Sequence, residues 1–487
     1  MALFVRINTD NAMKKKIIIH GSVAPGFEPL KDLFRSEMRT KAEENAQLCI
    51  YYQGQLVVDL WASKSNNTDF TADSLVNVFS SGKSLETLAI ASLVDRGLLN
   101  YNDQIADHWP EFAGNGKGGI TVADLMRHEA GLVSFKYTFD PEDLLKENIK
   151  QNSVGSVIEG VRARIPKDYR KRRNYHALTR GWVVNELFRR VDPKERTLGE
   201  YLQEEIAQPM GEDVNVGVRT EDLSRRAPVK GLNFGFYVKE SFKPKFMGRK
   251  VVHSAMDLGA IFTPIALNVG KAIYKNNTAK RKKVNVVRRE PSQAEEKYSG
   301  PLRNLSFKRD REEAVNFFNQ AIIAQGESAS FNANCSARGL ARVAAMMAAH
   351  GSFQGTEYFR ESAWQALHAH AEPKSLGGTV TTHFTQGGLN LFTMIGSKKN
   401  AIDRSLNKGR EGFYGWMGLG GSIFQWNAEH NIGFAFVPTS MHMMDLYNER
   451  GKVYQEEALR CVKSIRQREK GAVPRQCRSF ALNVGQA

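Results

Sequence analysis

Strand-like alternation of apolar and polar residues lies near both ends of the chain and is scarce in the long middle. Residues 45–63 contain two β-rich runs joined at Gln53-Gly54, which is typical of a hairpin. The same alternation returns only at 379–395 and 413–439. We therefore expect an α+β protein with one antiparallel sheet built from both chain ends, flanked by helices and interrupted by an inserted, mostly helical region.

This pattern predicts how the chain divides into domains. We expect an α/β sheet domain made of two separate segments, with the helical region and a basic loop between them. The predicted parts are an N-terminal extension at 1–20, the sheet domain at 21–80 and 310–470, the helical region at 81–309 with its basic loop at about 276–297, and a tail at 471–487.

Composition places the 487-residue chain among globular proteins, since 41% of its residues are hydrophobic and 25% are charged. Its net charge of +16 suits an anionic partner or a solvated basic surface. The charge comes without a Walker loop, a paired CxxC or an aromatic RNA-binding strand. We therefore predict no nucleic-acid partner.

The cysteines, the N-terminal residues and the lengths of the apolar runs indicate the cellular compartment of the protein. The four cysteines are scattered, without metal-ligand spacing, and are expected to be free thiols in a reducing compartment. Met1 to Ser22 lacks the apolar core of a signal peptide, and no apolar run reaches the ~18–20 residues of a membrane span. We expect a cytoplasmic protein, with a mitochondrial location as the alternative because of Arg6 and the lysines at 14–16. No oligomeric state is predicted.

The densest chemical signal is the run Val78-Phe79-Ser80-Ser81-Gly82-Lys83, directly before an apolar helical pattern at 84–99. Ser80 stands where that helix begins, and Lys83 follows at i+3 on the same face. The start of a helix favours developing negative charge, and a desolvated lysine amine can accept the proton of a serine hydroxyl. The alternative is a helix-capping serine beside a surface lysine.

The residues after this run resemble the β-lactamase-like serine hydrolases, which include the penicillin-binding-protein-like proteins, class C β-lactamases and related esterases. The resemblance rests on FSSGKSLETLAIASLVDRGLLNYNDQIADHWPEF and ITVADLMRHEAGL, and it extends over about 20–465. It implies the β-lactamase/transpeptidase-like fold and a small-molecule ester or amide substrate. It also implies an acyl-enzyme on Ser80, proton transfer by Lys83, and no cofactor.

Two further motifs match the family by resemblance. Tyr175, within NYHALT, matches its proton-transferring tyrosine, while Ala177 replaces the asparagine of the lactamases. In YGWMGLGGS, Trp416 stands for the family's Lys or His and Gly418 for its glycine. The resemblance makes the backbone N–H groups of Leu419 and Ser80 the oxyanion donors. The alternative for Tyr175 is an aromatic side chain packed in the core. The alternative for Gly418 is a glycine that a tight turn requires.

The two replacements bear on the substrate. Trp416 supplies no cation for a β-lactam carboxylate, and Ala177 supplies no side-chain amide. We therefore expect esters or amides with an apolar acyl group that packs against Trp416. The basic run at 170–173 either favours the phenolate of Tyr175 or is a solvated face.

The histidines do not predict a competing site. Neither His128 nor His176 has a visible carboxylate partner, so we expect His128 to make a structural hydrogen bond. His368 and His370 lack a supporting motif, and no metal site is predicted.

Three hypotheses follow. The first is an active serine hydrolase acting through an acyl-enzyme. The second is a non-catalytic or scaffolding member of the fold, suggested by Ala177, Trp416 and the basic residues at 280–289. The third is a peripheral contact with an anionic membrane, through the apolar stretch at 258–270 and the lysine-rich residues at 280–283.

Overall fold

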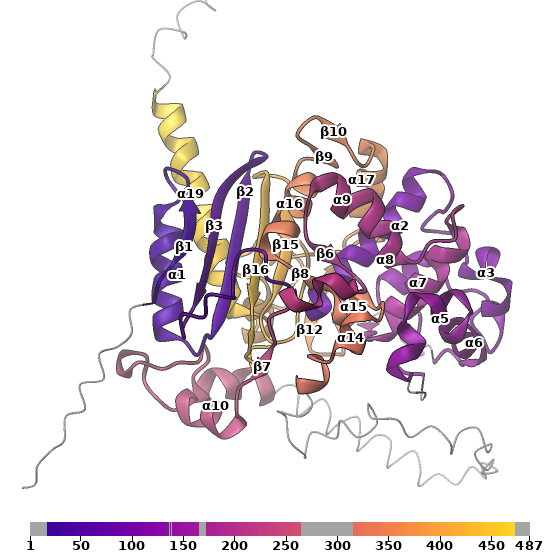
Figure 1. The fold of residues 1–487 in the computed structure, drawn as a ribbon, viewed down its shortest axis with the longest axis horizontal. Coiled ribbons are helices and arrows are strands. Elements are labelled where there is room, and N and C mark those ends of the chain that lie inside the picture. Colours follow the sequence, from indigo (N-terminus) through magenta and orange to yellow (C-terminus); the bar gives the residue numbers. More distant parts are fainter. Residues whose placement is uncertain (1–16, 136, 138, 165–171, 264–314, 473–487) are drawn as a thin grey trace, which may run out of the picture.

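A ten-stranded sheet runs through the middle of the protein (Figure 1). The computed structural model describes residues 17–135, 137, 139–164, 172–263 and 315–472. In spatial order the strands are β1 (His20–Val23), β3 (Gln55–Ser63), β2 (Asn45–Tyr52), β16 (Ile432–Pro438), β15 (Ile423–Asn427), β14 (Tyr414–Met417), β13 (Asn390–Leu391), β12 (Val380–Phe384), β11 (Glu372–Leu376) and β5 (Arg172–Arg173).

The sheet joins the two ends of the chain, as the sequence predicts. Strand β2 pairs antiparallel with β16 over seven residue pairs, from Ala46 opposite Pro438 to Tyr52 opposite Ile432. The predicted hairpin is present as β2–β3, and β12 and β13, which fall within the predicted strand region 379–395, pair with each other. The short β5 was not predicted: it comes from the middle of the chain and pairs parallel with β11.

Helices cover both faces of the sheet. On β2, Leu48 and Ile50 join one core cluster while Cys49 and Tyr51 join the other, because successive strand residues point to opposite faces. The first cluster packs under α1 (Glu28–Thr40) and the closing helix α19 (Glu449–Ala472), which stand together in Figure 1.

On the other face, α16 (Ala337–Ala348) lies directly against β16. A Cβ on Gly433 of β16 would stand 2.3 Å from the backbone nitrogen of Ala345, so only glycine permits this contact.

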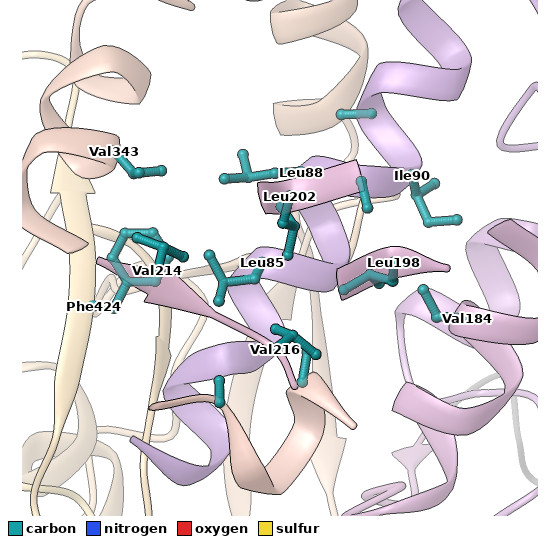
Figure 2. Close-up of a cluster of buried hydrophobic side chains, with 14 of the residues drawn as sticks. Leu85, Leu88, Ile90, Val184, Leu198, Leu202, Val214, Val216, Val343 and Phe424 are labelled. Carbon is teal, nitrogen blue, oxygen red and sulfur yellow. The ribbon is translucent and has the colours of Figure 1, made fainter. Parts of the chain in front are cut away.

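The helical region stands beside the sheet, beyond α16. Its core surrounds α2 (Lys83–Asp95), whose Leu85, Leu88 and Ile90 pack with side chains from several other elements (Figure 2). The remaining helices of the protein, inside and outside this region, are α3 (Ile105–His108), α4 (Val122–Met126), α5 (Lys146–Lys150), α6 (Ser153–Gly160), α7 (Thr179–Val191), α8 (Leu198–Tyr201), α9 (Gln208–Met210), α10 (Phe234–Ser241), α14 (Ala321–Gln325), α15 (Ala329–Asn332), α17 (Glu361–His368) and α18 (Ala401–Asn407).

Short strands complete the fold. A three-stranded sheet joins β4 to β8 and β8 to β6, and two strand pairs lie apart from it. These strands are β4 (Val76–Asn77), β8 (Asn334–Cys335), β6 (Val214–Asn215), the pair β7 (Lys230–Gly231) and β17 (Ser440–Met441), and the pair β9 (Ser352–Phe353) and β10 (Thr356–Glu357).

Several predictions concern residues outside the described part of the chain. The basic loop at 276–297 and nearly all of the tail at 471–487 lie there, and the division into domains stays a prediction. Three cysteines are buried free thiols, as predicted, namely Cys49, Cys335 and Cys461. Among the described helices, none is both long and apolar enough to cross a membrane.

Glu327 is a buried carboxyl group in the helical region, only 3% exposed. It accepts hydrogen bonds from Thr197 Oγ1 at 2.7 Å, the Gly199 N–H at 3.1 Å and Asn185 Nδ2 at 3.2 Å. No ion pair to it is present within the described residues. Burial therefore raises its pKa from 4.5 to about 7.

This carboxyl group predicts a pH-dependent stability. Below its unfolded pKa both states hold the proton, whereas at pH 8 folding must bury a charge, so stability is lost as the pH rises through about 7. In Glu327→Gln the amide oxygen can accept the bonds from Gly199 and Asn185, and the amide nitrogen can donate to Thr197 Oγ1, without the charge. We expect it to be more stable than the wild type by roughly 1–3 kcal/mol at pH 8 and equally stable at about pH 3, which is below the unfolded pKa, by urea unfolding.

The matched control is Glu357→Gln, which changes an exposed carboxyl group on β10. It is expected to leave stability unchanged at both pH values. A Glu327→Gln protein no more stable than the wild type at pH 8 would show that this carboxyl group does not carry the effect.

Candidate active site

Ser80 lies on a constrained turn that leads into α2. The turn is a short 3₁₀ helix, Phe79–Gly82, and Phe79 takes a φ of +48°, which is rare for a residue with a side chain. Its N–H donates to Asn77 Oδ1 at 2.8 Å and its ring packs on Phe318. A Cβ on Gly82 would stand 2.1 Å from the Ala329 carbonyl oxygen. The turn is thus held from both sides, which fixes Ser80 at the start of the helix.

Lys83 is buried directly behind Ser80. Its Nζ donates to Ser80 Oγ at 3.1 Å, to the Ala177 carbonyl at 2.6 Å and to the Ser330 carbonyl at 3.0 Å. A neutral amine has two hydrogens and one lone pair, so the two carbonyls can hold both hydrogens. The lone pair then faces Ser80 Oγ.

Burial also tunes this amine. Desolvation lowers the pKa of Lys83 from 10.5 to about 7, Glu86 acts in the opposite direction, and Arg180 adds to the lowering. A neutral form is therefore accessible at physiological pH, which meets the requirement for a general base.

A buried ion pair, Arg180 with Glu86, lies next to Lys83. Arg180 Nε and Glu86 Oε2 are 2.8 Å apart, and both side chains are fully buried. Ser330 Oγ donates to Glu86 Oε1 at 2.6 Å, and Arg180 Nη2 donates to the Lys83 carbonyl at 2.8 Å. The arginine compensates Glu86, so the carboxylate does not hold Lys83 in its charged form.

Tyr175 lines the same cavity as Ser80. Lys83 Nζ lies 5.0 Å from the centre of the Tyr175 ring. Trp416 Nε1 donates to Tyr175 Oη at 2.8 Å. Because the indole can only donate, the phenol's own hydrogen remains available to Ser80. The structure thus brings Ser80, Lys83 and Tyr175 together.

Of the basic run before Tyr175, the structure describes the side chain of Arg173, which does not fit either interpretation of the run. Arg173 is fully buried and pairs with Glu129 at 2.9 Å, while 170 and 171 lie outside the described residues. Burial raises the pKa of Tyr175 to about 12, against smaller lowering by its hydrogen bonds to Ser80 and Trp416. Tyr175 is therefore a neutral phenol near pH 7, and the expected stabilisation of its phenolate is wrong.

The loop after β14 brings backbone amides to Ser80. Ser80, Gly418 and Leu419 line one cavity of about 150 Å³. The N–H groups of Ser80 and Leu419 donate to no acceptor within the described residues, whereas the Gly418 N–H is taken by the Ser422 carbonyl at 2.8 Å. Two unused donors at one small cavity are the arrangement that an oxyanion hole requires.

Two residues of the α19 region brace this loop, and sequence reasoning missed both. Asn448 Nδ2 donates to the carbonyls of Gly418 at 2.9 Å and Ser422 at 2.8 Å. Arg450 Nη2 donates to the Gly420 carbonyl at 2.6 Å. The Gly418 carbonyl belongs to the same peptide unit as the Leu419 N–H, so Asn448 fixes the orientation of that amide. No sequence motif signals this role.

A larger cavity adjoins the first and shares Tyr175 and Trp416 with it. Its volume is about 590 Å³. Apolar side chains dominate its wall, and Arg164 also lines it. The apolar residues include Val133, Leu376, Val380, Leu406, Met417 and Leu446. Trp416 thus lines both the cavity of Ser80 and the larger apolar one.

The histidines are structural. His128 Nδ1 accepts the His176 N–H at 3.1 Å, which confirms the predicted hydrogen bond, and His176 Nε2 accepts the Leu132 N–H at 2.9 Å. Burial lowers the pKa of both rings. His368 bonds to Trp364 and Trp426. Across the described residues, no cluster of His, Cys, Asp and Glu is placed to hold a metal ion.

The glycine of the oxyanion loop gives a testable prediction. A Cβ on Gly418 would stand 2.0 Å from Ser422 Oγ and 2.2 Å from the Val78 carbonyl oxygen, which is backbone and cannot swing away. Gly418→Ala should therefore displace the Leu419 N–H. We expect kcat for an ester to fall by about 10²–10³-fold, the effect of losing one oxyanion donor.

The control for this change is Gly119→Ala, since a Cβ at Gly119 meets nothing within 4 Å. It should retain wild-type turnover. A Gly418→Ala enzyme within about twofold of the wild type in kcat would contradict the proposed donor geometry.

Comparisons with known proteins found similar sequences and similar folds. A family model described as Beta-lactamase matches residues 30–458. The esterase/beta-lactamase LipL of Mycobacterium tuberculosis (strain ATCC 25618 / H37Rv) is 34% identical over 198 residues, which cover 40% of this chain. The match spans only 44% of that relative's own length.

Two solved structures share the fold. A family VIII carboxylesterase superposes with a TM-score of 0.66 and 20% identity, over 91% of this chain and 100% of the other. A penicillin-binding protein homolog from Caulobacter crescentus gives a TM-score of 0.64 and 22% identity, again over 91% and 100%. These similarities show a β-lactamase/transpeptidase-like fold, as the sequence predicts.

Proposed function

The chain belongs to the beta-lactamase family of serine hydrolases, and we propose that it cleaves small esters or amides through an acyl-enzyme on Ser80. One observation carries the proposal. The buried Lys83 amine contacts the hydroxyl of Ser80 at 3.1 Å, and the neutral phenol of Tyr175 lines the same cavity as Ser80. This contact favours an active enzyme over a non-catalytic member of the fold.

In the first step Ser80 Oγ attacks the substrate carbonyl carbon. Lys83, as the neutral amine, takes the hydroxyl proton as the new C–O bond forms. The carbonyl electrons move to the oxygen, which the N–H groups of Ser80 and Leu419 stabilise. Such preorganised donors stabilise the transition state by about 2.7–4 kcal/mol each.

In the second step the bond to the leaving group breaks. Tyr175 has its pKa raised to about 12 by burial, so it keeps a proton that it can give to the departing alkoxide or amine. The protonated Lys83, which lies beside the phenol ring, then restores the proton of Tyr175. Water, or another alcohol, releases the acyl group by the same steps in reverse order.

The cavities support an apolar substrate. The wall beside Trp416 is mostly apolar, and the indole N–H is already bonded to Tyr175. A cavity of about 590 Å³ is within the range of small-molecule sites. We therefore expect esters with an apolar acyl group to react better than β-lactams.

A panel of p-nitrophenyl esters, from acetyl to dodecanoyl, tests this function alongside the chromogenic β-lactam nitrocefin. We expect turnover of the esters, with kcat/KM rising at least about tenfold between acetyl and the best longer chain, because each buried methylene contributes about 0.8 kcal/mol. We expect nitrocefin to be hydrolysed more slowly than the best ester. An enzyme that hydrolyses no ester, or prefers nitrocefin, would overturn the assignment.

A further inference from the structure

A small surface around the end of α10 exposes unusually large apolar side chains. Phe242 is 73% exposed, Phe246 90% and Met247 63%. They fall within residues 239–250, here called the 239–250 surface. In Figure 1, α10 lies at the lower margin of the molecule, below the sheet. Exposed aromatic residues gathered in this way mark interaction surfaces.

This exposure belongs to an anchored segment. Strand β7 pairs with β17 before α10 begins. The Tyr237 ring of α10 is buried and packs against the His442 ring, with 6.1 Å between the ring centres. After the surface, His253 Nε2 contacts Asp445 Oδ1 at 3.3 Å. The chain is therefore held on both sides of residues 239–250, so Phe242 and Phe246 remain exposed while their neighbours are packed.

The charges on this surface are mainly positive. Lys239, Lys245 and Lys250 are exposed, and none of the three forms an ion pair within the described residues. The carboxylate of Glu240 is 4% exposed and already pairs with Lys243. Basic side chains around exposed aromatic residues suit the boundary between anionic headgroups and acyl chains in a membrane.

We propose that the 239–250 surface docks onto membranes that carry anionic lipids, with Phe242, Phe246 and Met247 entering the headgroup layer and the three lysines contacting lipid phosphates and carboxylates. Each lysine near an anionic membrane contributes about 1 kcal/mol. This contact differs from the membrane hypothesis based on 258–270 and 280–283, most of which lies outside the described residues.

The anchor of this surface is close in sequence to the cleft. Strand β17, which pairs with β7, is followed by Met443 and Leu446, and both line the cavity of Ser80. The docking itself does not require the proposed catalysis.

Sedimentation of the full chain with lipid vesicles tests the proposal. The vesicles are phosphatidylcholine alone or with about 30% phosphatidylserine, at about 50 mM or 500 mM salt. We expect binding to the anionic vesicles at low salt, at least about tenfold weaker binding at high salt, and little on phosphatidylcholine alone. Equal recovery with and without anionic lipid would overturn the proposal.

Two variants separate the apolar and charged parts. Phe242→Ser with Phe246→Ser and Met247→Ser removes the apolar contacts, and Lys239→Glu with Lys245→Glu and Lys250→Glu reverses the charge. Each should weaken vesicle binding at least about tenfold. Unchanged melting temperatures and ester turnover verify that both variants fold.

A matched control changes another exposed apolar residue with neighbouring lysines, by Ile395→Ser with Lys398→Glu and Lys399→Glu. It should bind vesicles as the wild type does, and an equal loss would overturn the assignment to the 239–250 surface. Light scattering provides a second check. Self-association that the serine variant abolishes, without any vesicle binding, would identify a second copy of the chain as the occupant.

Discussion

Replacing Ser80 by alanine is expected to reduce kcat for an ester by about 10⁴-fold or more, because the acyl-enzyme loses its attachment point. The oxyanion donors and the apolar cavity remain, so KM should change little. Residual catalysis above water would come from those donors. Initial rates with the best p-nitrophenyl ester measure both constants.

The comparison for this variant is Ser81→Ala, on the same turn. Ser81 Oγ donates to the Ser422 carbonyl at 3.0 Å and contacts the Ser422 hydroxyl at 3.1 Å, and Ser81 is not among the residues that line the cavity of Ser80. Its loss should affect kcat far less than the loss of Ser80. Similar rates for the wild type and Ser80→Ala would show that another group carries the chemistry.

Replacing Lys83 by methionine is the second large change, since methionine fills similar space without an amine. We expect kcat/KM to fall by about 10²–10⁴-fold, the usual contribution of a general base. Lys83→Arg should be as slow, because a guanidinium group stays protonated.

The pH profile tests the same residue. Burial lowers the pKa of Lys83 to about 7, and only the neutral amine accepts a proton. In the wild type, kcat/KM should therefore rise with pH through about 7 and then level off. The residual activity of Lys83→Met should not show this rise. A wild-type profile that is flat between pH 5 and 9 would exclude Lys83 as the base.

The sequence predicted the groups that are close along the chain and those that belong to a motif. Ser80 and Lys83 are one helical turn apart, so their contact follows from helix geometry. Tyr175 and Trp416 were placed through the family resemblance. The sheet could be predicted because strand alternation is visible locally, and each hairpin joins neighbouring segments.

The groups that tune Lys83 could not be predicted, because they come from distant parts of the chain. Two of its acceptors are backbone carbonyls, of Ala177 and Ser330, and a carbonyl leaves no mark on the sequence. The Glu86–Arg180 pair likewise depends on how α2 packs against α7. Charge pairing of this kind is a tertiary property.

The basic run before Tyr175 is a case in which the charge was visible in the sequence but its partner was not. Its charge was visible, but Arg173 points into the protein and meets Glu129 and the Thr382 carbonyl. Its charge is therefore used in folding. Similarly, the apolar pattern of α2 suggested one buried face, yet residues 83–93 are all buried, since the core of the helical region surrounds this helix.

Peptide mapping by mass spectrometry after reaction with a fluorophosphonate tests the central claim most directly. The phosphorus should attach to one residue, Ser80, with loss of fluoride, and the labelling rate should rise with pH through about 7 because Lys83 takes the hydroxyl proton. An adduct on Ser330 or on any other serine, or full ester turnover after complete labelling elsewhere, would contradict the account.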